Sequence, residues 1–312
     1  MISNSDSWAL QEFSDLNLGD KRLNYRLMKL AEDFSKHPEF SINQACKDWH
    51  AAKAAYRFFQ NDVFSELEIL KPHIKNTAKR CRNYEYILAI QDTTVIGFSH
   101  HPKTTSLGNI GGCASSKTET HGLNMHSTLA LTPQGMPLGL LSNFLWAPSK
   151  ENKERSDRKA NHLLPTEEKK SYKWINALEE VHESLRGEVK TITICDRECD
   201  IFDFYLTAVN LESPVIVRCR DDRNIGSRFV PLNLGVKLNQ TKAFPHTIKI
   251  KVPIRGLKEN EKAKKSSLRY RDAELEIKSI PITLTPSRKL SQVVKEKINL
   301  FVVEAKEINP PS

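Results

Sequence analysis

Two aspartates stand in matching surroundings 104 residues apart. Asp92 follows an apolar, strand-forming run over residues 86–90 and precedes two threonines, and Asp196 follows a second such run over residues 191–195. Two buried strands that each deliver a carboxylate can hold both acids side by side at one edge of a sheet. Mg²⁺ is bound by a few carboxylates, with waters and substrate phosphates completing its shell. The pair therefore indicates metal-dependent phosphoryl transfer. The alternative is that each aspartate caps the next element.

The neighbours of these two aspartates are interpreted as supporting groups. Glu198 and Asp200 follow Asp196 within four residues, and we expect them to cap or support the site rather than to ligate. His121 and His126 lie near the start of a predicted hairpin, where a structural or DNA-facing role is favoured over metal ligation.

The net charge of +9 comes entirely from the last third of the chain. Residues 221–312 hold 19 lysines and arginines against 10 aspartates and glutamates, whereas the first 220 residues hold 28 of each. A basic region beside an acidic metal-type site indicates a polyanionic substrate, with nucleic acid the first candidate. A basic surface that only confers solubility is the alternative.

The composition favours a globular protein of the cytoplasm. The chain has 312 residues, enough for two or three domains, and its mean hydropathy is −0.49. No apolar stretch approaches the roughly 18 residues that a spanning helix needs, and the N-terminus lacks the features of a signal peptide. The six cysteines form no C-x-x-C pair, which favours reduced thiols.

Residues 1–72 predict a helical domain. Gly19 indicates a break and Asp20 an N-cap, after which residues 21–35 show an apolar face and a basic stripe at helical spacing. Short helices with basic faces suit phosphate or groove contact, and a small helical cap on the core is the open alternative. The basic residues expected to contact DNA here are Arg22, Arg26, Lys29, Lys53 and Arg57.

Residues 73–220 alternate strands and helices, and residues 221–312 turn to strands. The first region predicts a hairpin around 133–135, a charged loop over 149–170 and a helix over 172–185. This order is typical of an α/β fold with a mixed sheet. The second region predicts strands over 247–253, 268–271, 273–280 and 299–305. They favour an antiparallel sheet with one buried face and one basic, wet face.

Five short motifs occur in this order along the chain: LGDKR at 18–22, AYRFF at 55–59, QDTT at 91–94, CDRE at 195–198 and EINPP at 307–311. In these motifs the chain resembles the bacterial insertion-sequence transposases with a DDE catalytic site. The branch is the cut-and-paste one, whose third acid lies in a Tyr-Arg-Glu-Lys motif.

The resemblance implies three parts and a function. Residues 1–72 would bind double-stranded DNA at transposon ends, 73–220 would form a ribonuclease-H-like core, and 221–312 a basic β-sheet insertion. Asp92 and Asp196 would be the first two catalytic acids and would hold Mg²⁺, which Mn²⁺ can replace. Arg218 and Arg220 would contact DNA near the cleaved bond. The expected reaction is phosphodiester hydrolysis and strand transfer.

The sequence departs from the family pattern at the third acid. No Tyr-x-x-Arg is followed by Glu and Lys at the required spacing, and Glu304 and Glu307 belong by pattern to a strand and its exit. We therefore expect a C-terminally truncated family member, monomeric where a full-length one is a dimer on DNA. The alternative function is a non-catalytic fragment that occupies transposon ends and inhibits an intact transposase. A metal-dependent nuclease acting alone is a third option.

Overall fold

The computed structural model describes residues 7–98, 104–111, 120–148, 171–226, 231–253, 270–286 and 295–310. The chain divides into two compact units, Met1–Arg218 and Cys219–Ser312. No helix within these described ranges is both long and apolar enough to cross a membrane. The charged loop expected over 149–170 lies outside the described residues.

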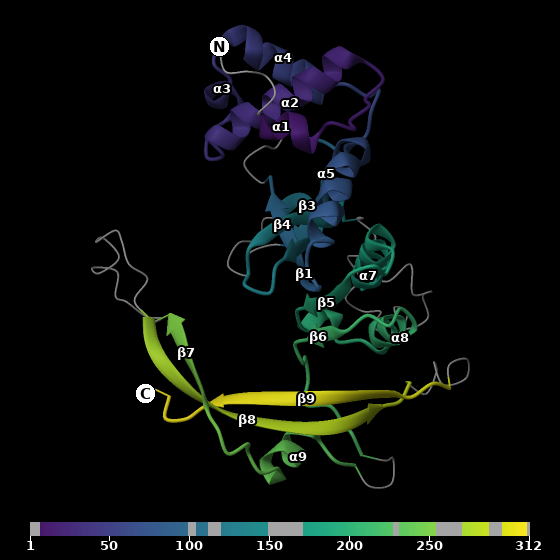
Figure 1. Cartoon of the computed structure of the whole chain (residues 1–312), viewed down its shortest axis with the longest axis vertical. Coiled ribbons are helices and arrows are strands. Elements are labelled where there is room, and N and C mark those ends of the chain that lie inside the picture. The colour runs from purple at the N-terminus through teal and green to yellow at the C-terminus, as the bar shows by residue number, and fades with distance from the viewer. Residues whose placement is uncertain are drawn as a thin grey trace. The chain divides into compact units, whose positions relative to one another are not determined.

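The first unit begins with a group of helices (Figure 1), of which the second and fourth along the chain supply most of one apolar core. The helices are α1 (Trp8–Glu12), α2 (Lys21–Lys36), α3 (Ile42–Ala45), α4 (Trp49–Phe59) and α5 (Glu66–Cys81). The Asp20 carboxylate accepts a hydrogen bond from the Arg22 backbone N–H at 2.8 Å, and Gly19 has a φ of +80°. The predicted N-cap and break are therefore confirmed. The end expected for the helical domain, at residue 72, falls inside α5.

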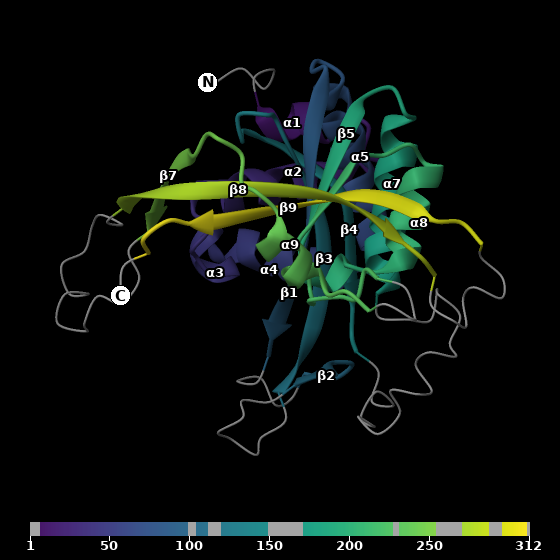
Figure 2. The ribbon, with the colours of Figure 1, turned by 90° about the horizontal axis from the view of Figure 1, so that it is seen from below.

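A six-stranded mixed sheet follows (Figure 2). Its strands are β1 (Tyr86–Gly97), β2 (Gly108–Gly111), β3 (Thr120–Leu131), β4 (Pro137–Trp146), β5 (Lys190–Cys195) and β6 (Val215–Val217). The order is β2-β3-β1-β5-β6, with β4 also paired to β3. Strands β1, β5 and β6 run parallel, whereas β3 is antiparallel to both β1 and β4. The predicted α/β class and the β3–β4 hairpin are confirmed.

Two helices supply the core beneath this sheet. These are α5 and α7 (Tyr172–Leu185); after α7, the described residues of the unit also form η4 (Arg197–Cys199) and α8 (Phe202–Asn210). Alternate residues of β1, Ile87 and Ala89, are fully buried and pack in one cluster with Cys81 of α5 and Val181 of α7. Burial raises the pKa of the Cys81 thiol to about 11. The period-2 pattern of β1 thus assigns one face of the sheet to the helices.

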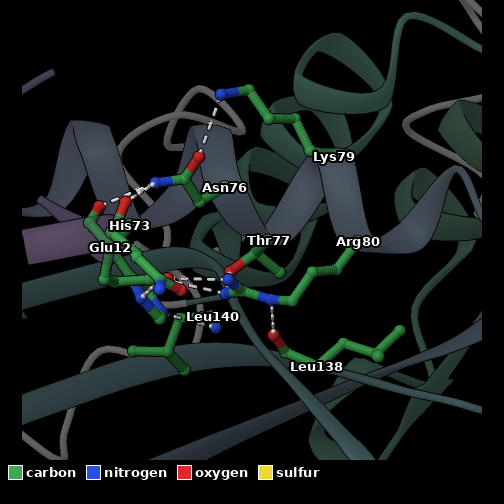
Figure 3. A network of polar contacts seen from close by, with 9 residues as sticks. Glu12, His73, Asn76, Thr77, Lys79, Arg80, Leu138 and Leu140 are labelled. Carbon is green, nitrogen blue, oxygen red and sulfur yellow. Dashed lines mark hydrogen bonds and ion pairs between the residues drawn. The ribbon is translucent and has the colours of Figure 1, made fainter. Parts of the chain in front are cut away.

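A polar network joins the first helix to α5 and the sheet edge (Figure 3). Arg80 of α5 donates two hydrogen bonds to the Glu12 carboxylate, at 2.7 and 3.0 Å, and a third to the Leu138 carbonyl of β4. His73 donates from Nδ1 to Glu12 at 2.6 Å and accepts the Leu140 N–H at Nε2. Burial opposes ionisation of Glu12, but the Arg80 and His73 contacts outweigh it and lower its pKa.

The approach of α5 to β4 depends on Gly139. A Cβ at this position would lie 2.2 Å from the Thr77 Oγ1, and φ is +134°. We expect Gly139→Ala to lower the free energy of unfolding by about 2 kcal/mol, measured by urea denaturation. Gly135→Ala is the matched control, because its φ is +87° but nothing lies within 4 Å of a Cβ there. Equal losses for both variants would show that the close packing is not limiting.

The second unit contains a three-stranded antiparallel sheet, as expected. Its elements are α9 (Leu234–Gln240), β7 (Ile248–Pro253), β8 (Tyr270–Leu284) and β9 (Ile298–Glu307). The order is β7-β8-β9, and α9 packs against β8 (Figure 1). The two strands expected over 268–271 and 273–280 are, in the described residues, a single strand that continues to Leu284.

The described part of this sheet does not present the single basic face that the sequence favoured. Its register places lysines opposite acids, as in Lys249 with Glu274 and Lys278 with Glu304. Cross-strand pairs of this kind cancel the charge locally. The described residues of 221–312 hold ten lysines and arginines against eight aspartates and glutamates, so most of the surplus lies outside them.

Candidate active site and DNA-binding surface

The two aspartates occupy equivalent positions on neighbouring parallel strands. Strands β1 and β5 pair in register up to Ile90 and Ile194, so Asp92 and Asp196 each stand two residues beyond the last pair. Side chains two residues apart share a face of a strand. Both aspartates therefore belong to the face opposite the one that α5 and α7 cover, and both are exposed. The expected adjacency of the two strands is confirmed.

Asp92 is not at the end of its strand, contrary to the sequence interpretation. Strand β1 continues for five residues to Gly97, and the Cα partner of Asp92 in β3 is Ser127. The pairing with β3 satisfies the backbone beyond the point where β5 leaves, so the two threonines extend the strand instead of stopping it. Asp92 instead marks the place where the β5 pairing ends.

Asp196 begins a tight turn and is accompanied by one of the predicted arginines. Its carbonyl accepts the Cys199 N–H at 3.0 Å, which closes η4. The Arg218 Nη1 lies 3.7 Å from the Asp196 Oδ1. Arg220 belongs to the second unit and pairs with the adjacent Asp221 at 2.7 Å. The structure thus brings Arg218 to the carboxylate, while Arg220 is engaged elsewhere.

The donor chemistry at this position suits a hard cation. Two exposed carboxylates from adjacent strands leave most of an octahedral shell to waters and substrate phosphates, which is how Mg²⁺ is usually held. The residues that the structure describes contain no cluster of three or more His, Cys, Asp or Glu side chains with metal-binding geometry. The nearby Cys199 thiol is fully buried, and burial, followed by Cys195, raises its pKa far above the usual range. A thiol that stays protonated is no metal ligand.

The other acids have structural partners. Asp200 is buried and accepts a hydrogen bond from the Tyr205 hydroxyl at 2.9 Å. Glu304 and Glu307 both lie in β9, as expected, where they face Lys278 and Arg271. The contact of Asp200 agrees with the supporting role expected for it, and Glu304 and Glu307 belong to the β8–β9 pairing.

A buried polar layer lies beneath the residues that flank Asp92. His126 of β3 is fully buried, and its Nδ1 lies 2.9 Å from the Thr93 Oγ1. Its Nε2 lies 3.4 Å from the Gln91 Oε1, and its ring meets Trp174 edge to face at 4.5 Å between centroids. The sequence favours a structural or DNA-facing role for His126 but does not predict this layer. The signal in the sequence is the spacing of Gln91, which lies two residues after Ala89 and four after Ile87 and therefore shares their face of the strand.

His126 is held in its neutral form. Burial, and then the positive charge of Lys173, lower its pKa from 6.5 to about 4. A neutral imidazole can donate from one ring nitrogen and accept at the other. That matches its two partners, with the proton on Nε2 toward Gln91 and with Nδ1 accepting from Thr93.

Helix α4 presents cations and aromatic rings on its outer side. Ala52, Ala55 and Phe58 are buried, whereas the residues on the opposite side of the helix are exposed. The exposed residues include Trp49, Lys53, Tyr56 and Arg57. Trp49 is 70% exposed, although tryptophan is on average a highly buried residue. Lys53 and Arg57 make no ion pair with any described residue, so both are available to an anion.

The three basic residues of α2 that the sequence predicts to contact DNA differ in their availability. Arg22 forms an ion pair with Asp20 at 2.8 Å, and its side chain is 92% exposed. Lys29 pairs at 2.8 Å with Asp33, which is buried, so this lysine has a structural task. Arg26 is half-buried and pairs with no acid among the described residues. The predicted stripe therefore contains two engaged cations and one free one.

One comparison with known proteins identifies the N-terminal part. Residues 5–64 match the family model described as "Transposase DNA-binding". The matched region contains α1 to α4 and lies within the 1–72 segment that the sequence predicts to bind DNA. It covers about a fifth of the chain, so it characterises this region and not the whole protein.

Solved structures of one transposase are also similar. The Mos1 transposase paired-end complex with the left transposon end matches at 14% identity and a TM-score of 0.23, over 60% of this chain and 56% of that chain. The Mos1 mariner paired end complex with Mn matches at 12% identity and a TM-score of 0.22, with the same coverage. The chain thus spans little more than half of those chains, and similarity at this level carries no argument about it.

Proposed function

We propose that this chain is a DNA transposase of the insertion-sequence type, which binds double-stranded DNA at transposon ends in the cytoplasm. The observation that carries the proposal is the match of residues 5–64 to transposase DNA-binding domains. The outer side of α4 supports it, because unpaired cations beside exposed aromatic rings suit phosphate and groove contact. The short helix α3 and a three-residue turn precede α4, an arrangement that resembles a helix-turn-helix.

The sheet supports a ribonuclease-H-like core as the second part of the proposal. Three parallel strands, β1, β5 and β6, continue into the antiparallel hairpin β3–β4, in the spatial order β4-β3-β1-β5-β6. This order places β1 and its Asp92 at the centre, directly beside β5. Functional carboxylates commonly lie at the point where parallel strands end.

We assign the chemistry to the two aspartates. Asp92 and Asp196 would hold Mg²⁺, which Mn²⁺ can replace, and the bound metal would supply Lewis-acid activation of a phosphodiester. Arg218, beside Asp196, would add positive charge where a DNA phosphate approaches. Its exposed guanidinium is free to move toward a phosphate, because an exposed ion pair at 3.7 Å contributes little stability.

DNA recognition is tested by selection from a pool of random duplexes. The full chain is immobilised, and duplexes retained in about 0.1 M salt are sequenced over successive rounds. We expect one duplex motif to be enriched, with retention that weakens as salt increases. A pool without any enriched motif would refute binding to a specific DNA end, although not binding to DNA as such.

The metal assignment is tested by electron paramagnetic resonance of Mn²⁺ added to the full chain. We expect binding by the wild-type chain and an affinity at least about tenfold weaker in Asp92→Asn and in Asp196→Asn. Asp203→Asn, in α8, is the control for the loss of one carboxylate elsewhere in the first unit. Equal Mn²⁺ affinity in all four proteins would remove the metal from this site.

A further inference from the structure

The first residues of α7 contact both aspartate-bearing segments. Lys173 donates to the Glu198 carboxylate at 3.2 Å, and Glu198 lies in η4, two residues after Asp196. The next residue, Trp174, is buried and packs its ring against His126. His126 in turn contacts the two residues that flank Asp92. One short piece of helix is therefore connected to the turn after Asp196 and to the strand around Asp92.

Lys173 is an unusual choice for this place. Its side chain is only 15% exposed, and its Nζ lies 5.4 Å from the Trp174 ring centroid and 5.9 Å from that of Trp146. Two aromatic faces attract the ammonium, while Glu198 supplies the opposite charge. An ordinary core position would carry an apolar residue here, because desolvating an ammonium costs free energy. The cation is held at a defined point between the sheet and η4.

We propose that Lys173 and Trp174 are positioning residues, which hold the Asp92 strand and the Asp196 turn in fixed relation from the covered side of the sheet. The inference rests on the proposed metal site, because it assigns these residues to the geometry of the two carboxylates. Trp174 acts on the Asp92 side through His126, Gln91 and Thr93. Lys173 acts on the Asp196 side through Glu198. Neither residue touches the metal or the DNA.

Packing alone is the competing explanation, and it makes a different prediction. Replacing a residue that only fills space should destabilise the whole unit equally. Replacing a residue that positions η4 should first increase the opening of the backbone in that turn. The reporters are the Cys199 and Asp200 amides, which donate to the Asp196 and Arg197 carbonyls at 3.0 and 3.3 Å. Their hydrogen exchange measures how often the turn opens.

The test compares two variants. Lys173→Met keeps roughly the length of the side chain and removes its charge, whereas Lys173→Arg keeps the charge. Hydrogen exchange of the full chain is followed by NMR without added metal. We expect the Cys199 and Asp200 amides to exchange about threefold faster in Lys173→Met and nearly as in wild type in Lys173→Arg, the size expected for a half-exposed ion pair. The amides of the β1–β3 pairing, in the same unit, are the internal control, because equally accelerated exchange there would mean that the whole unit has lost stability. Unchanged exchange at η4 in Lys173→Met would overturn the proposal.

Two further measurements separate this inference from the proposed function. Glu198→Gln should produce the same acceleration, and the double variant with Lys173→Met should add nothing, because both act through one contact. Additive effects would overturn the assignment. Mn²⁺ affinity should fall about threefold in Lys173→Met and recover in Lys173→Arg. If the wild-type chain binds no Mn²⁺, the metal assignment fails. The hydrogen exchange of the η4 amides still decides whether Lys173 positions that turn.

Discussion

Replacing both Lys53 and Arg57 with alanine is expected to weaken binding to duplex DNA roughly 60-fold in 0.1 M salt. Each lost phosphate contact lowers the slope of log affinity against log salt by about 0.9, and the two together lower it by about two. Both cations project from the outer side of α4 and pair with no described acid, so their loss should leave the helix intact. Affinity is measured by fluorescence anisotropy over a salt series, with the enriched duplex as probe.

The matched control removes the same charge from elsewhere in the first unit. Lys71 and Lys190 are exposed, and they lie outside α4, on α5 and at the start of β5. The double variant Lys71→Ala with Lys190→Ala should keep the wild-type slope of log affinity against log salt, because neither lysine lies on the outer side of α4. Equal losses in both double variants would mean that net charge, and not α4, governs binding.

Acidification should cost the first unit about 3 kcal/mol of stability through His126 alone. The unfolded chain protonates this histidine near pH 6.5, whereas the folded chain does so only near pH 4. Between those pH values the unfolded state binds a proton that the folded state does not bind, so the free energy of unfolding falls as the pH falls. The contribution is fully present above about pH 6.5 and is lost by about pH 4. The free energy of unfolding is measured by urea denaturation at several pH values.

Other groups also titrate in this window, so the comparison is made against His126→Gln. Glutamine keeps a donor and an acceptor for Thr93 and Gln91 but carries no proton equilibrium. We expect the variant to be less stable than wild type at pH 7. The difference in the free energy of unfolding between the two proteins should narrow steadily down to pH 4. Parallel curves for the two proteins would show that His126 titrates normally in the folded chain.

Local pattern was enough for much of the fold. The cap at Asp20, the turn after Leu131 and the 172–185 helix follow from residue types at short spacing, and all three are confirmed. Such features depend on interactions within a few residues, which the sequence displays directly. The same reasoning found Asp92 and Asp196, because each follows a strand-forming run.

The sequence by itself determined most of the secondary structure and the α/β class, and it supplied the candidate residues for binding a metal or DNA. Tertiary structure alone decided which of them are available. Lys29 is engaged by buried Asp33, Lys249 stands opposite Glu274, and Asp92 lies within its strand because β3 continues to pair beyond β5. Each of these depends on residues that meet across a packed interface or a strand register. Such contacts are decided by the free energy of the whole fold, and no local pattern records them.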